Sequence, residues 1–129
     1  PNGNLEFYID HVENVMFDED KIFTIQNVPH KISVVGWAFD ARSKLPVEDL
    51  YVIIDDTITD KVEYKHNRPD VVSHFGFDKT HKKGVLFGWL SQFDSDDLAD
   101  GCHKISLKFL KNKHTEIKIP TNHMLCIKK

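Results

Sequence analysis

The stretch KISVVGWAFD, residues 31–40, decides the fold class of this chain. Its apolar residues fall on both faces of an extended strand, which is typical of a strand at the centre of a sheet that is covered on both sides. Gly36 removes a side chain at a place where a neighbouring element can then approach closely. We therefore expect a central strand, buried between two layers, over residues 31–40.

Shorter runs with strand composition flank this stretch on both sides. Residues 50–54 are β-branched and aromatic enough to form a second central strand, and the more polar residues 57–64 are typical of an edge strand. A final hairpin is expected to start at Gly101, with Pro120 interrupting its returning strand. Further strands are predicted over residues 5–15, 22–25, 85–90, 116–119 and 124–127. About seven to nine short strands predict an all-β antiparallel sandwich.

The segment from Arg68 to Phe75 is the one convincing helical turn in the sequence. Pro69 suits a first helical position, and Asp70 is expected to cap the short helix. Arg68 is expected to form a charge-assisted bond to a carboxylate such as Asp40, or to backbone carbonyls. We predict a structural role for this trio, so that an Arg68→Ala variant should be less stable.

Length and composition are those of an ordinary folded domain. The chain has 129 residues, of which 40% are hydrophobic and 29% charged, and we expect a single domain over residues 1–129. The formal net charge of −3 gives no basic footprint for nucleic acid, and no apolar run of about 18 residues predicts a membrane span. Because the chain starts at Pro1, it is expected to be a fragment of a longer protein.

The two cysteines leave two alternatives open. Cys102 and Cys126 can face each other across the final hairpin, or they can remain free and buried, which is the commoner outcome for such residues and the one we expect. Two cysteines cannot define a disulfide scaffold, so the sequence does not fix the redox compartment.

Two groups of polar residues have the composition of metal ligands but lack diagnostic spacing. The first is a histidine group and the second an acidic loop; solvated side chains are the expectation for both. No serine or cysteine has the setting of a nucleophile, and no glycine-rich loop precedes a helix, so we expect no catalytic residue, cofactor or metal. The groups are His66, His74 and His81, and Asp94, Asp96, Asp97 and Asp100.

Several aromatic residues have the chemistry needed to stack on sugar rings if they reach the surface. Trp37 and Phe87 lie in apolar strands and are expected in the core. Tyr64, next to His66, is a better candidate for exposure. The candidate ligand contacts are therefore Tyr64, His66 and Trp89.

Between Ile32 and Leu110 the chain resembles a small immunoglobulin-like β-sandwich module attached to bacterial glycosyltransferases and related cell-envelope polymer transferases. The matching elements are Gly36-Trp37-Ala38-Phe39-Asp40, the strand from Leu50 to Asp56, Arg68-Pro69-Asp70-Val71, Phe87-Gly88-Trp89, and Leu98 with Gly101-Cys102-His103. The resemblance implies that these residues form a structural motif, made up of Gly36, Trp37, Asp40, Arg68, Pro69, Asp70, Gly101 and His103. It transfers no catalytic residue.

The resemblance implies a non-catalytic accessory domain of a bacterial glycan or teichoic-acid-type transferase. Such a domain would contact the catalytic domain of its parent protein, another protein partner or a glycan. A cytoplasmic or inner-membrane-peripheral location then follows, and self-association stays open. The alternative is a stand-alone secreted carbohydrate-binding or adhesin-like module, with calcium held by the acidic loop. The chain departs from the pattern before Ile32 and over residues 74–83.

Overall fold

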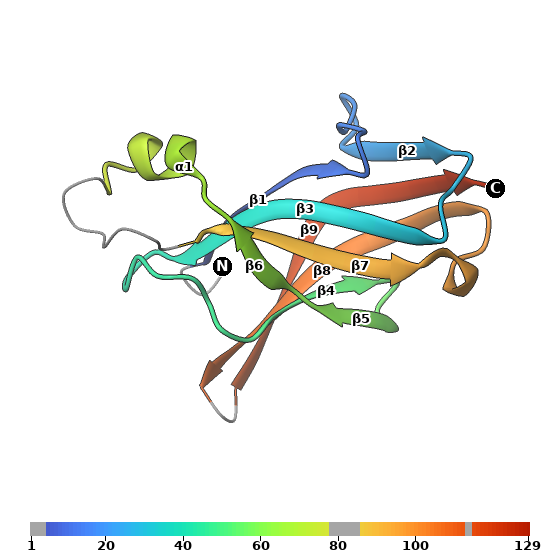
Figure 1. The fold of residues 1–129 in the computed structure, drawn as a ribbon. Helices are drawn as coiled ribbons and strands as arrows, with labels where there is room; N and C mark the ends of the chain where they lie inside the picture. Colours follow the sequence, from blue (N-terminus) through green and yellow to red (C-terminus); the bar gives the residue numbers. More distant parts are fainter. Residues whose placement is uncertain (1–4, 78–85, 113–114) are drawn as a thin grey trace.

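The computed structural model describes residues 5–77, 86–112 and 115–129, and in this part of the chain it contains nine strands and one short α-helix (Figure 1). The strands form one four-stranded and one five-stranded sheet, which pack against each other. The prediction of an all-β sandwich with one helical turn is confirmed.

The four-stranded sheet has the order β1-β3-β7-β6, and all its strand pairs are antiparallel. β3 covers Lys31–Asp40, as predicted, and lies in the interior of the sheet. β1 covers Leu5–Val12 and so ends earlier than expected, because the turn residue Glu13 with its positive φ follows it. β7 covers Gly88–Asp94 and β6 covers Glu63–His66. The predicted strand at residues 85–90 is therefore displaced, and its first residue lies outside the described residues.

The five-stranded sheet has the order β2-β9-β8-β4-β5. β4, at Leu50–Ile54, has its predicted bounds. β2 and β9 pair in parallel, while the other strand pairs described in this sheet are antiparallel. Most of the chain lies between β2 and β9 in the sequence. A parallel pair requires a long connection of this kind, because a tight turn cannot join parallel strands. The remaining bounds are Ile22–Gln26 for β2, Thr115–Lys128 for β9, Gly101–Asn112 for β8 and Ile58–Lys61 for β5.

The predicted edge strand over residues 57–64 is two strands in different sheets. β5 belongs to the five-stranded sheet and β6 to the four-stranded sheet, with Val62 alone between them. Val62 is buried in the core between the sheets, and its amide donates a hydrogen bond to the carbonyl of Leu50. Burial of this one side chain at the change of sheet explains why the run does not continue as a single strand.

Pro120 does not interrupt the last strand. β9 continues through it, and a bulge between the pairs Ser106–Pro120 and Ile105–His123 accommodates Thr121 and Asn122. The Thr121 hydroxyl donates to the carbonyl of Ile105 over 2.6 Å, and Asn122 takes a positive φ of 65°. β2 pairs with β9 only from Met124 onward, so Pro120 lies in a stretch where β9 pairs with β8 alone.

The main core lies between the sheets, and a second, smaller cluster lies on the outer side of the four-stranded sheet. This second cluster joins Phe39, Phe77 and Phe87 to Val71 of α1, which covers Pro69–His74 beyond the end of β6 (Figure 1). Phe87 is buried as expected, but Trp37 is only half-buried at the edge of this cluster. The prediction of a core position for Trp37 was therefore wrong. Leu98 closes one end of the main core, as predicted.

Candidate binding face on the four-stranded sheet

Four residues form a row across the outer face of the four-stranded sheet. Tyr8 of β1 pairs with Trp37 of β3, Trp37 with Gly88 of β7, and Gly88 with His66 of β6. Residues that pair directly on neighbouring strands point to the same face, and here the adjoining residues Ile9, Ala38 and Trp89 are buried on the inner face. The row therefore faces away from the core.

Tyr8 and Trp37 form an aromatic pair within this row. Their ring centroids are 6.3 Å apart, and their planes differ by 18°. Trp37 is also in edge contact with Phe75, which follows α1, at 5.6 Å. Tyr8 is in edge contact with Phe17 at 5.8 Å and is 41% exposed, so the pair presents an aromatic surface that packs against the chain on both sides.

Next to the aromatic pair lies a hollow of about 600 Å³, which we call the Gly88 hollow. A Cβ atom on Gly88 would lie 2.7 Å from the Cβ atom of His66 and 3.0 Å from Cγ of Arg68, so the missing side chain lets His66 and Arg68 approach the strand closely beside the hollow. A second hollow of about 250 Å³ lies between Trp37 and α1. The Gly88 hollow is lined by Asp10, His11, Val35, Gly36, His66, Arg68 and Gly88, and the second by Trp37, Asp70, Val71, His74 and Phe75.

Arg68 links the two hollows through its guanidinium group. Nη1 donates to Asp10 over 2.5 Å, while Nε and Nη2 donate to the two carboxylate oxygens of Asp70 over 2.9 and 2.7 Å. The bonds to Asp70 and then to Asp10 outweigh partial burial and raise the pKa of Arg68 further above its usual range. The side chains of Arg68 and Asp10 are 21% and 20% exposed, against 64% for Asp70.

The predicted charge-assisted bond from Arg68 to a carboxylate is confirmed, but two details of the Arg68-Pro69-Asp70 arrangement were wrong. Asp40 does not bind Arg68, because the Asp40 carboxylate accepts the amides of Arg42 and Ser43 in its own turn. Asp70 does not cap the helix: Arg68 holds the N-cap position, without a side-chain capping bond, and Asp70 lies in the first turn. Pro69 does occupy the first helical position.

The partner of Arg68 that sequence reasoning missed is Asp10. Its only signal in the sequence was its place on the polar face of the first strand, in line with Tyr8.

Of the three predicted ligand contacts, only His66 lies at the hollow. Trp89 is fully buried, and its indole packs over Gly36, where a Cβ atom would lie 2.6 Å from Cζ2. The close approach expected at Gly36 is thus confirmed, but Trp89 is not on the surface. Tyr64 packs against the main core and its hydroxyl is buried; burial raises the pKa of Tyr64 well above its usual range, against a smaller opposite effect of the Val47 amide.

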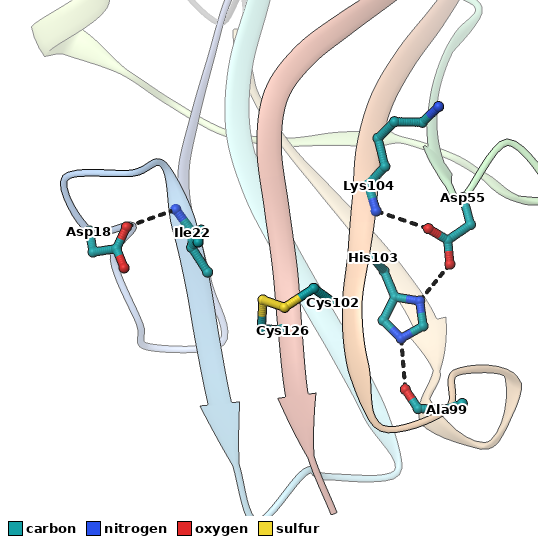
Figure 2. Close-up of a disulfide and its surroundings, with 8 residues drawn as sticks. All are labelled: Asp18, Ile22, Asp55, Ala99, Cys102, His103, Lys104 and Cys126. Atoms are coloured by element: carbon teal, nitrogen blue, oxygen red, sulfur yellow. Dashed lines mark hydrogen bonds and ion pairs between the residues drawn. A yellow bond between two sulfur atoms is a disulfide. The ribbon is translucent and has the colours of Figure 1, made fainter.

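The predicted motif residues Gly101 and His103 lie on β8 of the other sheet. Figure 2 shows His103 with its partners. Gly101 starts β8 with a φ of 122°, a value that favours glycine. The His103 ring lies between the Asp55 carboxylate, 2.5 Å from Nδ1, and the Ala99 carbonyl, 2.7 Å from Nε2. Burial opposes protonation, but these two acceptors prevail and raise the pKa of His103. His103 therefore ties the turn after β4 to the start of β8.

Cys102 and Cys126 form a disulfide bond, so the expectation of free thiols was wrong. The two residues pair directly on β8 and β9, which brings their side chains to the same face of the sheet at short range (Figure 2). The bond cross-links the two longest described strands, near the start of β8 and near the end of β9.

The candidate metal ligands do not converge as the sequence grouped them. His66 and His74 line different hollows, and His81 lies outside the described residues. In the acidic loop, ligand atoms of Asp94 and Asp96 come within 4.8 Å of each other and of His30. The Asp94 carboxylate already accepts a hydrogen bond from the amide of Asp96, and the Asp100 carboxylate accepts one from the amide of Lys129.

Among the described residues, the structure has no helix with the length and apolar composition of a membrane span.

Comparisons with known proteins assign no family. No protein-family description matches the sequence, and no curated protein matches it. Among solved structures, the chain is similar to part of an endo-β-1,4-mannanase from Thermotoga petrophila, with a TM-score of 0.49 and 16% sequence identity. The match covers 93% of this chain and 20% of that enzyme. A likeness of this size assigns neither a family nor an activity.

Proposed function

We propose that this chain is a non-catalytic glycan-binding domain that holds a sugar chain on the outer face of its four-stranded sheet. The observation that carries the proposal is the Tyr8–Trp37 aromatic pair, which lies in register with Gly88 and beside the Gly88 hollow, whose lining includes Asp10, His66 and Arg68. The aromatic pair matches the apolar side of a pyranose ring, and the polar groups around the hollow match its hydroxyl groups.

A pyranose ring is amphipathic in the same way as this face. Its C–H bonds form an apolar side that packs against aromatic rings, whose electron-rich faces attract C–H hydrogens. Its hydroxyl groups need hydrogen-bond partners at the rim, and Asp10, His66 and Arg68 place such groups around the hollow. A binding site of this kind needs no catalytic residue. It is open to solvent, so it can accept one stretch of a longer glycan chain.

We also propose that the domain works in an oxidising compartment, either secreted or on a cell surface. The Cys102–Cys126 bond supports this location over the cytoplasmic one, since disulfides persist mainly outside the cytosol. Attachment to a glycan or teichoic-acid-type transferase remains a prediction from the resemblance alone. Mass spectrometry of the chain taken from its native source tests the location: a mass that shows two free thiols would contradict it.

The binding proposal is tested by screening the purified chain on a glycan array and titrating the best ligand by calorimetry. Replacing Tyr8 by Ala should weaken binding at least about tenfold, the effect of losing roughly 1.4 kcal/mol of contact. The matched control is Tyr51→Ala, because Tyr51 lies on the other sheet, where it packs under Lys108. If the chain binds no glycan, or if both variants bind like the original, the proposal is wrong.

A further inference from the structure

We infer that the glycan held on this face is an uncharged, hydroxyl-rich chain and not a polyanion such as a polyol-phosphate or polyuronate chain. The inference rests on the proposed function, because it names the chemical class that the same face selects. Three properties of the side chains around the Gly88 hollow and the aromatic pair lead to it: their net charge, the engagement of Arg68, and the presence of unoccupied hydrogen-bond acceptors.

The described residues that line the two hollows carry more negative than positive charge. Asp10 and Asp70 line the two hollows, and Glu6 is exposed on β1, two residues before Tyr8 and on the same side of the strand. Among the described lining residues, Arg68 is the only lysine or arginine. A phosphate or carboxylate group bound here would lie close to carboxylates, and juxtaposed like charges are costly in a binding site.

The guanidinium group of Arg68 is already engaged by these carboxylates. Its Nε and Nη2 atoms form the paired bonds to Asp70, and Nη1 bonds to Asp10. Such paired, charge-assisted bonds are the geometry by which arginine binds an anion. An anionic ligand would therefore have to displace one of these two carboxylates and leave it without its cation.

The hollow offers acceptor atoms that no described residue occupies. The bond from Arg68 uses Oδ2 of Asp10, and the described residues offer no hydrogen-bond partner to Oδ1. His11 must donate Nδ1–H to the carbonyl of Glu13, 2.6 Å away, which makes Nε2 of the neutral ring an acceptor. Hydroxyl groups donate to such atoms, whereas phosphates and carboxylates cannot. The hollow is thus matched to sugar hydroxyls.

The inference is tested by titrating the purified chain at neutral pH with four defined polymers. Soluble mannan and mixed-linkage glucan are the uncharged probes, while polyglycerol phosphate and polygalacturonate are the polyanions. We expect an uncharged polymer to bind at least tenfold more tightly than either polyanion, with an affinity that salt does not change. A polyanion that binds more tightly, with an affinity that falls as salt is added, would overturn the inference.

Two variants separate failure of this inference from failure of the proposed function. If a polyanion binds and Tyr8→Ala abolishes that binding, the face binds glycans but the inferred class is wrong. If no polymer of either class binds, both proposals fail. Glu6→Gln removes one exposed negative charge at nearly constant shape, and it should strengthen the residual binding of polyanions; unchanged polyanion binding in this variant would contradict the charge argument.

Discussion

At the scale of single residues, Arg68 contributes most to the order of the outer face. Its side chain passes over Gly88 of β7 and bonds to Asp70 in α1 and to Asp10 on β1, which is 58 residues away in the sequence. We expect Arg68→Ala to lower the free energy of unfolding by about 2 kcal/mol, because it leaves the half-buried carboxylate of Asp10 without its partner. Urea-induced unfolding, followed by tryptophan fluorescence, measures this change.

The two partners of Arg68 provide the control for this prediction. Asp10 is much less exposed than Asp70, and solvent screens an exposed pair more strongly. Asp10→Asn should therefore cost more stability than Asp70→Asn. An Arg68→Ala variant with an unchanged unfolding midpoint would show that the contacts do not stabilise the fold.

Two histidines should give the stability of the domain opposite dependences on pH. The Asp55 and Ala99 acceptors raise the pKa of His103 despite its burial, so its contribution is full below the unfolded-state pKa of about 6.5 and is lost as pH rises through the folded-state value. Burial between Phe17 and Phe23 lowers the pKa of His123, although the Lys21 carbonyl opposes this, so stability falls as pH drops below about 6.5.

Thermal unfolding as a function of pH tests both signs. His103→Gln should flatten the loss of stability above pH 6.5 or so, and His123→Leu should flatten the loss below it. The two variants serve as controls for each other, since each should change only one side of the curve. A His103→Gln profile that still falls on the alkaline side would show that another group is responsible.

Single-residue roles were predictable where they depend on the local chain. Pro69 at the start of a helix and Gly36 beside a bulky neighbour follow from backbone geometry, and both are as predicted. The partner of Arg68 was not predictable, because Asp10 is 58 residues away and the sequence offers 20 acidic residues. Tertiary structure alone brings this pair together.

At the scale of elements, the disulfide stabilises the pairing of β8 with β9. It closes a loop with a sequence separation of 24 residues, and the loss of chain entropy in the unfolded state is worth about 3 kcal/mol for a loop of this size. Replacing both cysteines by serine should lower the free energy of unfolding by roughly that amount. Urea unfolding of the original chain with and without reductant should show the same difference, and equal midpoints would contradict the prediction.

Strand bounds were predictable where composition alone determines them. β3 and β4 are dense in β-branched and aromatic residues, end at polar residues, and have the predicted bounds. The division between β5 and β6 was not predictable, since the residues on both sides of Val62 are polar and only its burial between the layers marks the change of sheet. The parallel pairing of β2 with β9 likewise has no local signal.

At the scale of the whole molecule, the stabilising cross-link and the candidate binding face belong to different sheets. The disulfide joins strands of the five-stranded sheet, while Tyr8, Trp37, Gly88 and His66 lie on the outer side of the four-stranded sheet. Reduced protein that remains folded at low temperature should therefore bind a glycan with unchanged affinity. Calorimetry with and without reductant measures this, with circular dichroism to verify folding; a large loss of affinity in folded, reduced protein would show that the sheets are coupled.

The candidate face itself was only partly predictable from the sequence. Aromatic residues suggested sugar stacking, and His66 was among the expected contacts, but Tyr8 was not, because its neighbourhood is set by the pairing of β1 with β3. Trp89 was misplaced because a tryptophan in an alternating strand looks the same on either face until the register is known. The sequence thus indicates the type of chemistry, while the sheet register determines which residues supply it.

The single-residue link at Val62 makes the domain unequally tolerant of insertions. An extra residue there would turn the side chains of β6 by half a period, which would direct His66 inward and expose Tyr64 to water. An extra residue within residues 41–44, between β3 and β4, would instead lengthen an exposed connection that lies outside both neighbouring strands. Related chains that keep this surface should therefore vary in length in that connection and stay constant at the link.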